Sequence, residues 1–453
     1  MLRVNAESKI IFAILCNRAS PVKSERFTPF VQPRWRSDLK LAQILSWRPG
    51  AYLRASGQLF GWLLLKALAQ AATAFLLARY LGAEGYGLFV AVLAVNSFFS
   101  PLAGLGLHGV LLCDGARTPP DKLPTLISEV AVLWWPSALV FSVAAFLVAL
   151  WTLPSSLPTG LLAIFSLSEV VSTSFIELIG RLEQSQHRMK EYGALGAGLV
   201  LSRLAGLCIL VVFFEIEPVT WVAVYATTGL MYTGFIGFRT WRRYQLKATT
   251  SRNWSLISKG FPFAVGLVSL RLQSEFNKPV LAQYAYSMSG NFSAAQRLID
   301  LACLPLNAMQ EALWPKFYKT DDAPKKAKAI VCFLFVAAVA TGLLIVLVAP
   351  AVPYFLGKSF GATSSLLMFL AGLPALQVLR NVMNAGVIAR NRQSLFIWVY
   401  LAGGISSIMF NALLVPRFSL KGAIGSAYLT EMLSIVVLSL CIYLTNHHRR
   451  RNA

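Results

Sequence analysis

Long apolar runs alternate with short polar connections from about residue 57 almost to the C-terminus. A helix needs about twenty mainly apolar residues to cross a bilayer, and about twelve runs are long enough. They lie near 57–78, 86–112, 129–151, 158–180, 193–214, 219–239, 259–283, 288–314, 329–350, 366–388, 394–415 and 422–444. This pattern predicts an all-α polytopic membrane protein with about 12 transmembrane helices.

Composition agrees with lipid as the solvent, because 56% of the residues are hydrophobic and the mean hydropathy is +0.61. Of the 41 Lys and Arg residues, about thirty-one lie in the two terminal tails and in alternate connections, and about four lie in the other connections. Such an excess marks the cytoplasmic side. We therefore expect a multi-pass protein of the cell inner membrane with both termini in the cytoplasm. The net charge of +22 is spread over short loops, which argues against nucleic acid as a partner.

The longest inside connection divides the chain into two sets of six spans. Since both sets begin in the cytoplasm, they would be related by an axis along the membrane normal, as parallel lobes around a central cavity. A faint repeat at a constant offset supports this: Ala78 and Ala282, Tyr80 and Tyr284, Pro101 and Pro305. The expected segments are a basic cytoplasmic tail at 1–52, an N-lobe at 53–240, a basic linker at 241–258, a C-lobe at 259–445 and a basic tail at 446–453.

Several classes of activity lack the sequence features that they need. A membrane glycosyltransferase or polymerase usually has a substantial extramembrane loop, whereas the longest connection here is a linker of about twenty residues. No Gly-rich P-loop is present to bind ATP, and four His residues give no recognisable metal cluster. We therefore expect a membrane transporter, not an enzyme, with no cofactor and no metal.

Six cations lie inside the apolar runs, where each costs about 2.5–3.5 kcal/mol if it faces lipid. They are Lys66, Arg203, Arg271, Lys278, Arg297 and Arg380. They must face protein or a water-filled cavity, and internal ion pairs are one explanation. The excess of cations over acids favours a second one, in which they bind an anionic substrate, since Arg holds phosphate oxygens in a bidentate way.

The seventh span carries the densest group of charges. Arg271, Glu275 and Lys278 are spaced at i, i+4 and i+7, which predicts one common helix face. Arg297 and Asp300 are three apart in the next span and likewise share a face. These spacings make the start of the second half the best candidate for a phosphate site.

Acidic residues inside the spans are candidates for ion coupling, because burial disfavours the charged form of a carboxylate. The candidates are Glu169, Glu177, Glu275, Asp300 and Glu431. The alternative is that these acids neutralise the nearby cations, with Glu169 or Glu177 as the partner of Lys66 or Arg203.

Several motifs resemble those of the polysaccharide (O-antigen and capsule-unit, Wzx-type) flippases of the multidrug/oligosaccharidyl-lipid/polysaccharide exporter superfamily. The matching stretches are Leu77–Gly87, Gly104–Leu107, Lys259–Ala264, Leu313–Phe317, Phe355–Lys358 and Leu420–Ala427. The resemblance covers about residues 53–445 and implies a V-shaped fold of two six-helix lobes that alternates between inward- and outward-open states. It also implies a basic central cavity, for which Arg271, Lys278, Arg297 and Lys66 match by position. In this family an acidic residue commonly lies in the middle of span 7, near the position of Asn277. Because this chain has Asn there, the ion-coupling role of that acid is not carried over.

The resemblance implies that the cargo is a polyprenyl-diphosphate-linked oligosaccharide, moved to the outer leaflet of the bacterial inner membrane for surface polysaccharide and lipopolysaccharide synthesis. Its expected partners are this lipid-linked oligosaccharide, the bilayer and other polysaccharide-assembly proteins. Two alternatives stay open, a cation-coupled multidrug exporter of the same superfamily and a membrane glycosyltransferase or polymerase. An exporter of organic cations should have an acidic or aromatic cavity, whereas the charges inside these spans are net basic.

Overall fold

The computed structural model describes residues 51–154, 157–246, 253–318, 324–389 and 395–451, and within these ranges it is helical and contains no strand. The predicted N-terminal tail lies almost wholly outside the described residues. The helices are α3 (Ala51–Ala103), α4 (Leu107–Cys113), α5 (Leu123–Thr152), α6 (Thr159–Ser185), α7 (Met189–Phe213), α8 (Pro218–Tyr244), α9 (Ser255–Glu275), α10 (Asn277–Ala282), α11 (Tyr286–Ala302), α12 (Leu304–Tyr318), α13 (Pro324–Val348), η1 (Ala349–Ala351), α14 (Val352–Leu356), η2 (Lys358–Phe360), α15 (Gly361–Leu370), α16 (Leu373–Ala389) and α17 (Leu395–Arg451).

Two of the helices are helical hairpins. The apolar stretches of α3 and α17 are 46 residues each, which as straight helices would be about 70 Å long, more than twice the hydrocarbon thickness. Each contains one residue with non-helical backbone angles, Gly82 (φ 67°, ψ −176°) in α3 and Ser419 (φ 51°, ψ −125°) in α17. The Ser426 hydroxyl donates to Asn411 Oδ1 at 2.9 Å across the second turn. The chain therefore reverses direction inside both helices.

Length and composition alone give eight candidate membrane spans among the described residues, or nine with the bent pair Lys358–Leu370 and Leu373–Ala385. Each hairpin accounts for two crossings, and the consecutive helices α11 and α12 make one more. The described part of the chain thus has about twelve crossings, in the order that the apolar runs predict. The predicted all-α polytopic fold is confirmed.

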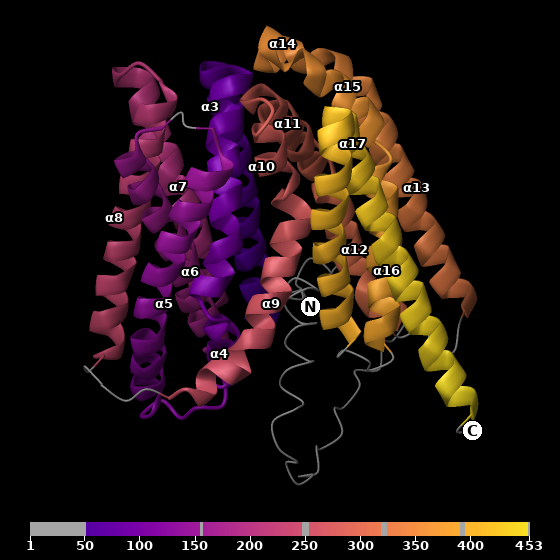
Figure 1. Ribbon diagram of the computed structural model, residues 1–453. Coiled ribbons are helices and arrows are strands. Elements are labelled where there is room, and N and C mark those ends of the chain that lie inside the picture. The colour runs from indigo at the N-terminus through magenta and orange to yellow at the C-terminus, as the bar shows by residue number, and fades with distance from the viewer. Residues whose placement is uncertain (1–50, 155–156, 247–252, 319–323, 390–394, 452–453) are drawn as a thin grey trace, which may run out of the picture.

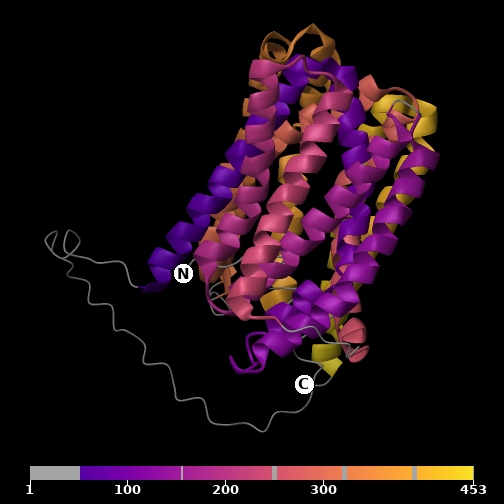
Figure 2. The ribbon, with the colours of Figure 1, turned by 90° about the vertical axis from the view of Figure 1, so that its left-hand side faces the viewer.

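The crossings form two groups. Helices α3–α8 lie on one side of the molecule and α10–α17 on the other, with α9 passing between them (Figure 1). Seen from the side of the first group, the long helices tilt together (Figure 2). The C-terminal end of α17 lies at the same end of the bundle as α4 (Figure 1), so the basic C-terminal residues and the basic connections of the first group share one end.

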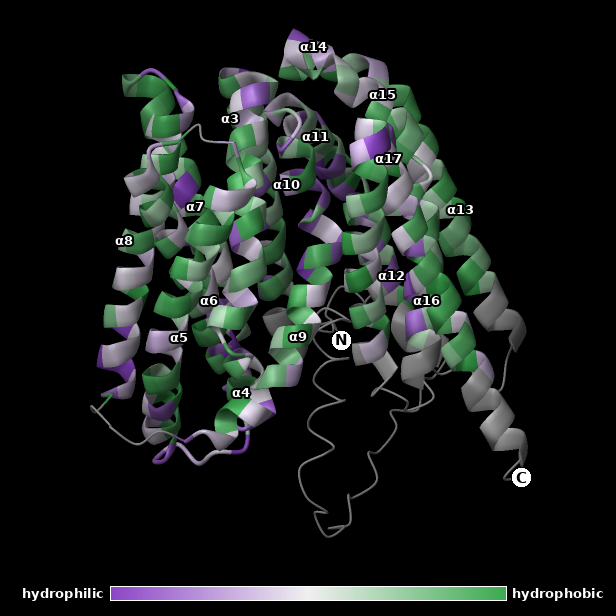
Figure 3. Ribbon diagram, viewed as in Figure 1, coloured by the Kyte–Doolittle hydropathy of each residue, from purple (hydrophilic) through white to green (hydrophobic). Residues whose placement is uncertain are grey.

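The outer surface of the bundle is apolar. Helix α13 has a mean hydropathy of 3.0 over its best window, yet only 22% of that window is buried. Trp151, Met231 and Leu347 are 87%, 75% and 78% exposed. Hydropathy colouring shows α13 almost entirely apolar, whereas polar residues interrupt α10 and α11 inside the bundle (Figure 3). Exposed apolar surface on this scale is stable only against lipid.

Prolines explain the breaks in the second group. Helix α9 ends shortly before Pro279, and α11 ends at Ala302, shortly before Pro305. Helix α15 ends at Leu370, shortly before Pro374. Proline lacks a backbone donor and disfavours the helical conformation of the preceding residue. These breaks place short polar segments of α10 and α11 beside the first group.

A central cavity lined from both groups

A pocket of about 100 Å³ lies where the first group of helices meets α11 of the second group. Its walls come from both halves of α3, from α7 and α8, and from α11 of the second group. The lining residues are Gln70, Thr73, Ala74, Leu77, Tyr86, Phe89, Val90, Leu93, Val200, Arg203, Tyr225 and Arg297. The turn at Gly82 makes this wall possible, because it brings the two halves of α3 against one space.

Arg203 enters the pocket from α7 and is tied to two buried partners. Its Nη2 donates to Glu169 Oε2 at 2.7 Å, and the Tyr225 hydroxyl donates to the same oxygen at 2.9 Å. The guanidinium carbon lies 3.8 Å from the centre of the Tyr225 ring, a cation–π contact. Arg203 Nε is buried and has no hydrogen-bond partner among the described residues. The side chain thus retains an unused donor in the wall of the pocket.

Arg297 reaches the same pocket from α11, in the other group of helices. Glu275 and Asp300 lie close enough to interact with it electrostatically, but it forms no ion pair within the described part of the chain. Arg203 and Arg297 therefore present two cations to one space from opposite lobes. Two guanidinium groups around a pocket suit an anion with several oxygens.

Two of the six predicted cations are neutralised elsewhere in the interior. Lys278 is buried and forms an ion pair with Glu275, three residues before it. Arg380 Nη1 lies 3.2 Å from Glu431 Oε1, between α16 and α17. Neither lines the pocket. For these two, and for Arg203 with Glu169, the structure shows the internal ion pairs that the sequence left open as an alternative.

Lys66 and Arg271 belong to a second polar group. The Lys66 ammonium lies against α7, where it would be 3.5 Å from a Cβ atom at Gly196, and it interacts electrostatically with Glu177, Arg181 and Arg271. Arg181 Nε donates to Glu177 Oε1 at 2.7 Å. Lys66 lies one helical turn from Gln70 of the pocket wall. This group extends the positive region along α3 beyond the pocket.

The charges of span 7 stay close to one another despite a break in the helix. Helix α9 ends at Glu275 and α10 begins at Asn277, yet Glu275 and Lys278 form an ion pair across this point. Arg271 also interacts electrostatically with Glu275. Arg271 is exposed, whereas Lys278 is buried, so the three charges differ in their access to solvent.

Sequence reasoning missed several residues of the cavity. Tyr86, Phe89 and Tyr225 line it, but aromatic residues in apolar runs are usually core. Outside the pocket, Arg181 lies in α6 and pairs with Glu177. The i, i+4 spacing of that pair is a signal that could have found it.

No group of three or more His, Cys, Asp or Glu side chains suited to a metal ion occurs among the residues that the structure describes. The polar chemistry of the interior is that of guanidinium, ammonium, hydroxyl and carboxylate groups. These groups can bind anions, donate hydrogen bonds and exchange protons.

A model of the polysaccharide biosynthesis protein family matches residues 54–321, which is more than half of the chain. The chain belongs to this family. No curated protein matches the sequence at a significant level. The family match covers all but the first three residues of α3 and the whole of α4–α12, so it includes every residue that lines the pocket.

Solved structures share the fold. The lipid II flippase MurJ in an inward closed conformation matches with a TM-score of 0.67 and 13% identity, over 86% of this chain and 87% of that chain. An inward-facing multidrug resistance MATE family transporter of the MOP superfamily matches with a TM-score of 0.62 and 14% identity, over 84% of this chain and 96% of that chain. A MOP superfamily transporter from Pyrococcus furiosus matches with a TM-score of 0.53 and 12% identity, over 90% of this chain and 99% of that chain. The chain therefore has the fold of MOP superfamily transporters.

Proposed function

We propose that this protein is a flippase that carries a polyprenyl-diphosphate-linked oligosaccharide from the cytoplasmic to the outer leaflet of the bacterial inner membrane by alternating access. The observation that carries the proposal is the pocket between the lobes, to which α7 contributes Arg203 and α11 contributes Arg297. An anion bound between these groups would touch both lobes at once. Such a ligand can favour one arrangement of the lobes over another, as alternating access requires.

The diphosphate is the part of this cargo that the pocket fits. Two guanidinium groups can each form paired hydrogen bonds to phosphate oxygens, and Arg203 Nε is a buried donor with no partner among the described residues. Tyr86 and Tyr225 add hydroxyl groups and ring faces to the same walls. The sugars would occupy the rest of the space between the lobes, and the prenyl tail would remain in lipid.

We propose that both termini are cytoplasmic. The basic stretches around 181–190 and 239–259 and the Arg-rich C-terminal residues fit the positive-inside rule in this orientation. An inside-negative potential then drives a bound anion outward with about 2.3 kcal/mol per charge per 100 mV. The charge of the cargo would thus contribute to the direction of transport. Polysaccharide-assembly enzymes on the outer side would consume the product and are the proposed functional partners.

Glu169 is the carboxylate that we propose for proton coupling. It is buried, and its ion-pair partner Arg203 also lines the pocket. A diphosphate that binds Arg203 competes with Glu169 for the guanidinium. A buried carboxylate that loses its counter-charge takes up a proton, so cargo binding and protonation of Glu169 would be linked. Glu177, Glu275 and Glu431 are paired with cations outside the pocket, and Asp300 is exposed.

A cation-coupled multidrug exporter would share this fold. The pocket argues against that function, because its two charged lining residues are both arginines. Glu169 neutralises Arg203, but an organic cation bound there would still be repelled by Arg297.

Binding to prenyl diphosphate tests the proposal directly. We expect the purified protein to bind a prenyl diphosphate more tightly than the prenyl monophosphate, measured by native mass spectrometry or microscale thermophoresis. The change Arg297→Ala should weaken diphosphate binding by about 10- to 100-fold, the effect of losing one to two charge-assisted hydrogen bonds. Arg242→Ala is a matched control, because Arg242 is exposed in the last turn of α8. Equal affinities for the two lipids, with no effect of Arg297→Ala, would rule out a diphosphate site.

A further inference from the structure

Helices α3 and α11 meet backbone to backbone where the second half of α3 begins. A Cβ atom at Gly87 would lie 1.8 Å from the Tyr286 carbonyl oxygen, and one at Gly290 would lie 2.0 Å from the Ala83 carbonyl oxygen. Both distances are far below any van der Waals contact. Only glycine at both positions permits this approach.

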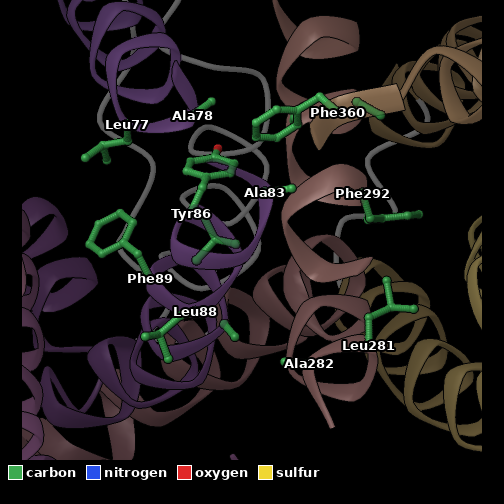
Figure 4. Packing of buried hydrophobic residues seen from close by; sticks show 14 of the residues in the cluster. Leu77, Ala78, Ala83, Tyr86, Leu88, Phe89, Leu281, Ala282, Phe292 and Phe360 are labelled. Atoms are coloured by element: carbon green, nitrogen blue, oxygen red, sulfur yellow. The ribbon is translucent and has the colours of Figure 1, made fainter. Parts of the chain in front are cut away.

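This contact joins the two lobes directly beside the pocket. Gly87 follows Tyr86, which lines the pocket and whose hydroxyl lies 3.5 Å from Ser293 Oγ of α11. In close view, Ala83 and Tyr86 face the helix that carries Phe292, with Phe360 beside them (Figure 4). These side chains belong to one buried cluster. The contact is therefore buried, close-packed and shared between the lobes.

Short helices of the second lobe also hold α3 at this end. Arg79 Nη1 donates to the Phe355 carbonyl of α14 at 3.2 Å, and the Ala83 amide donates to Ser359 Oγ of η2 at 3.3 Å. Gly357, with φ +109°, forms the sharp turn between α14 and η2. The motif Phe355–Lys358 thus has a structural role, since it places Ser359 over the turn of α3.

We propose that the Gly87–Gly290 contact, with the α14–η2 segment over it, is the outer gate of the transporter. The proposal rests on the transport function and membrane orientation given above. Opening towards the outside requires α3 and α11 to separate at this point, and closing requires their backbones to meet again. Packed interfaces have discrete arrangements and do not deform continuously. One added methyl group would therefore hold the gate open.

A second glycine contact gives a comparison at the opposite end of the bundle. A Cβ at Gly106 would lie 1.8 Å from the Gly260 carbonyl oxygen, between the α3–α4 connection and the start of α9. That contact is equally tight but lies away from the pocket and from α14. Opening that contact favours access from the inside, so a methyl group at Gly106 should not raise access from the outside.

The experiment measures access to the pocket from outside, in right-side-out vesicles of cells that make the full chain. Val200→Cys places a thiol in the pocket wall, and a membrane-impermeant maleimide is added outside. Peptide mass spectrometry reads the modification of that one site. We expect Gly87→Ala and Gly290→Ala to raise the labelling rate at least about tenfold, because each shifts the gate from mostly closed to mostly open.

Gly61→Ala and Gly234→Ala are matched controls, since a Cβ at either position meets no atom within 4 Å. We expect both controls to label at the parent rate and Gly106→Ala to label no faster than the parent. Unchanged labelling of Gly87→Ala at normal expression, or an equal rise in the Gly61→Ala control, overturns the proposal. If Gly87→Ala does not reach the membrane, Ser359→Ala replaces it as the test variant, because it removes one gate hydrogen bond and should raise labelling about threefold. An unchanged rate in that variant also overturns the proposal.

This readout needs no cargo, so it separates the gate from the cargo proposal. Faster labelling of the glycine variants, in a protein that does not bind prenyl diphosphate, would support the gate and reject the cargo. Diphosphate binding without any change in labelling would support the cargo and reject the gate.

Discussion

Arg203 belongs to both the interior of the first lobe and the wall of the pocket. Its ion pair with Glu169 and its contact with the Tyr225 ring neutralise and position a charge that would otherwise be costly inside a membrane. The same side chain keeps Nε buried without a hydrogen-bond partner among the described residues. Arg203 is stable inside the membrane without cargo because Glu169 neutralises it. We expect it to exchange Glu169 for the diphosphate when cargo binds, so the same residue serves folding and binding.

Removing Glu169 should be costly. Glu169→Ala leaves Arg203 buried without a counter-charge, and we expect a loss of about 3–5 kcal/mol of stability, seen as a lower thermal unfolding temperature in detergent. Glu215→Ala is the comparison, because Glu215 is exposed in the connection between α7 and α8 and the change should alter stability by no more than about 0.5 kcal/mol. The double change Glu169→Leu with Arg203→Met should regain most of the stability but lose diphosphate binding. Equal, small effects of both single variants would contradict this account of the ion pair.

At the scale of elements, the hairpin of α3 depends on one residue. Gly82 has φ 67° and ψ −176°, a region that is essentially restricted to glycine. Gly82→Ala should cost about 1–3 kcal/mol of stability from backbone strain alone, because the added Cβ would have an ordinary 3.6 Å contact with Ser359 Oγ. Gly61→Ala, inside the first half of α3, should be neutral or slightly stabilising. Thermal unfolding of the two variants tests this, and an equally stable Gly82→Ala would show that the turn tolerates side chains.

The sequence predicted the helices better than it predicted which charged residues pair with one another. Apolar runs located the crossings because lipid imposes one strong pattern on every span. The Glu177–Arg181 pair is local and could be read from its spacing. The Arg203–Glu169 pair joins α7 to α6 across 34 residues, and only the packing of those helices brings it together. Because such pairs depend on helix packing, the sequence predicted six cations around the cavity, whereas two of the six, Arg203 and Arg297, line the pocket.

For the whole molecule, the structure places the two lobes in contact beside a pocket whose charged residues come from both sides. Its orientation in the membrane is a separate prediction. A cysteine introduced at Glu217, in the connection between α7 and α8, should react with an impermeant maleimide added outside intact cells. A fluorescent protein fused after Ala453 should fluoresce, as cytoplasmic fusions do. Labelling of Glu217→Cys only after the cells are broken would reverse the orientation and with it the proposed direction of transport.

The most direct test of the central claim is flipping by the purified protein in liposomes. A polyprenyl-diphosphate-linked oligosaccharide with a fluorescent sugar is placed in both leaflets, and an impermeant quencher reports how much reaches the outer leaflet over time. We predict rapid exchange with the native protein, faster when a potential drives the anion outward, and a loss of about 10-fold or more in Arg297→Ala but not in Arg242→Ala. Exchange that is no faster than in protein-free liposomes, or that is unaffected by Arg297→Ala, would contradict the account.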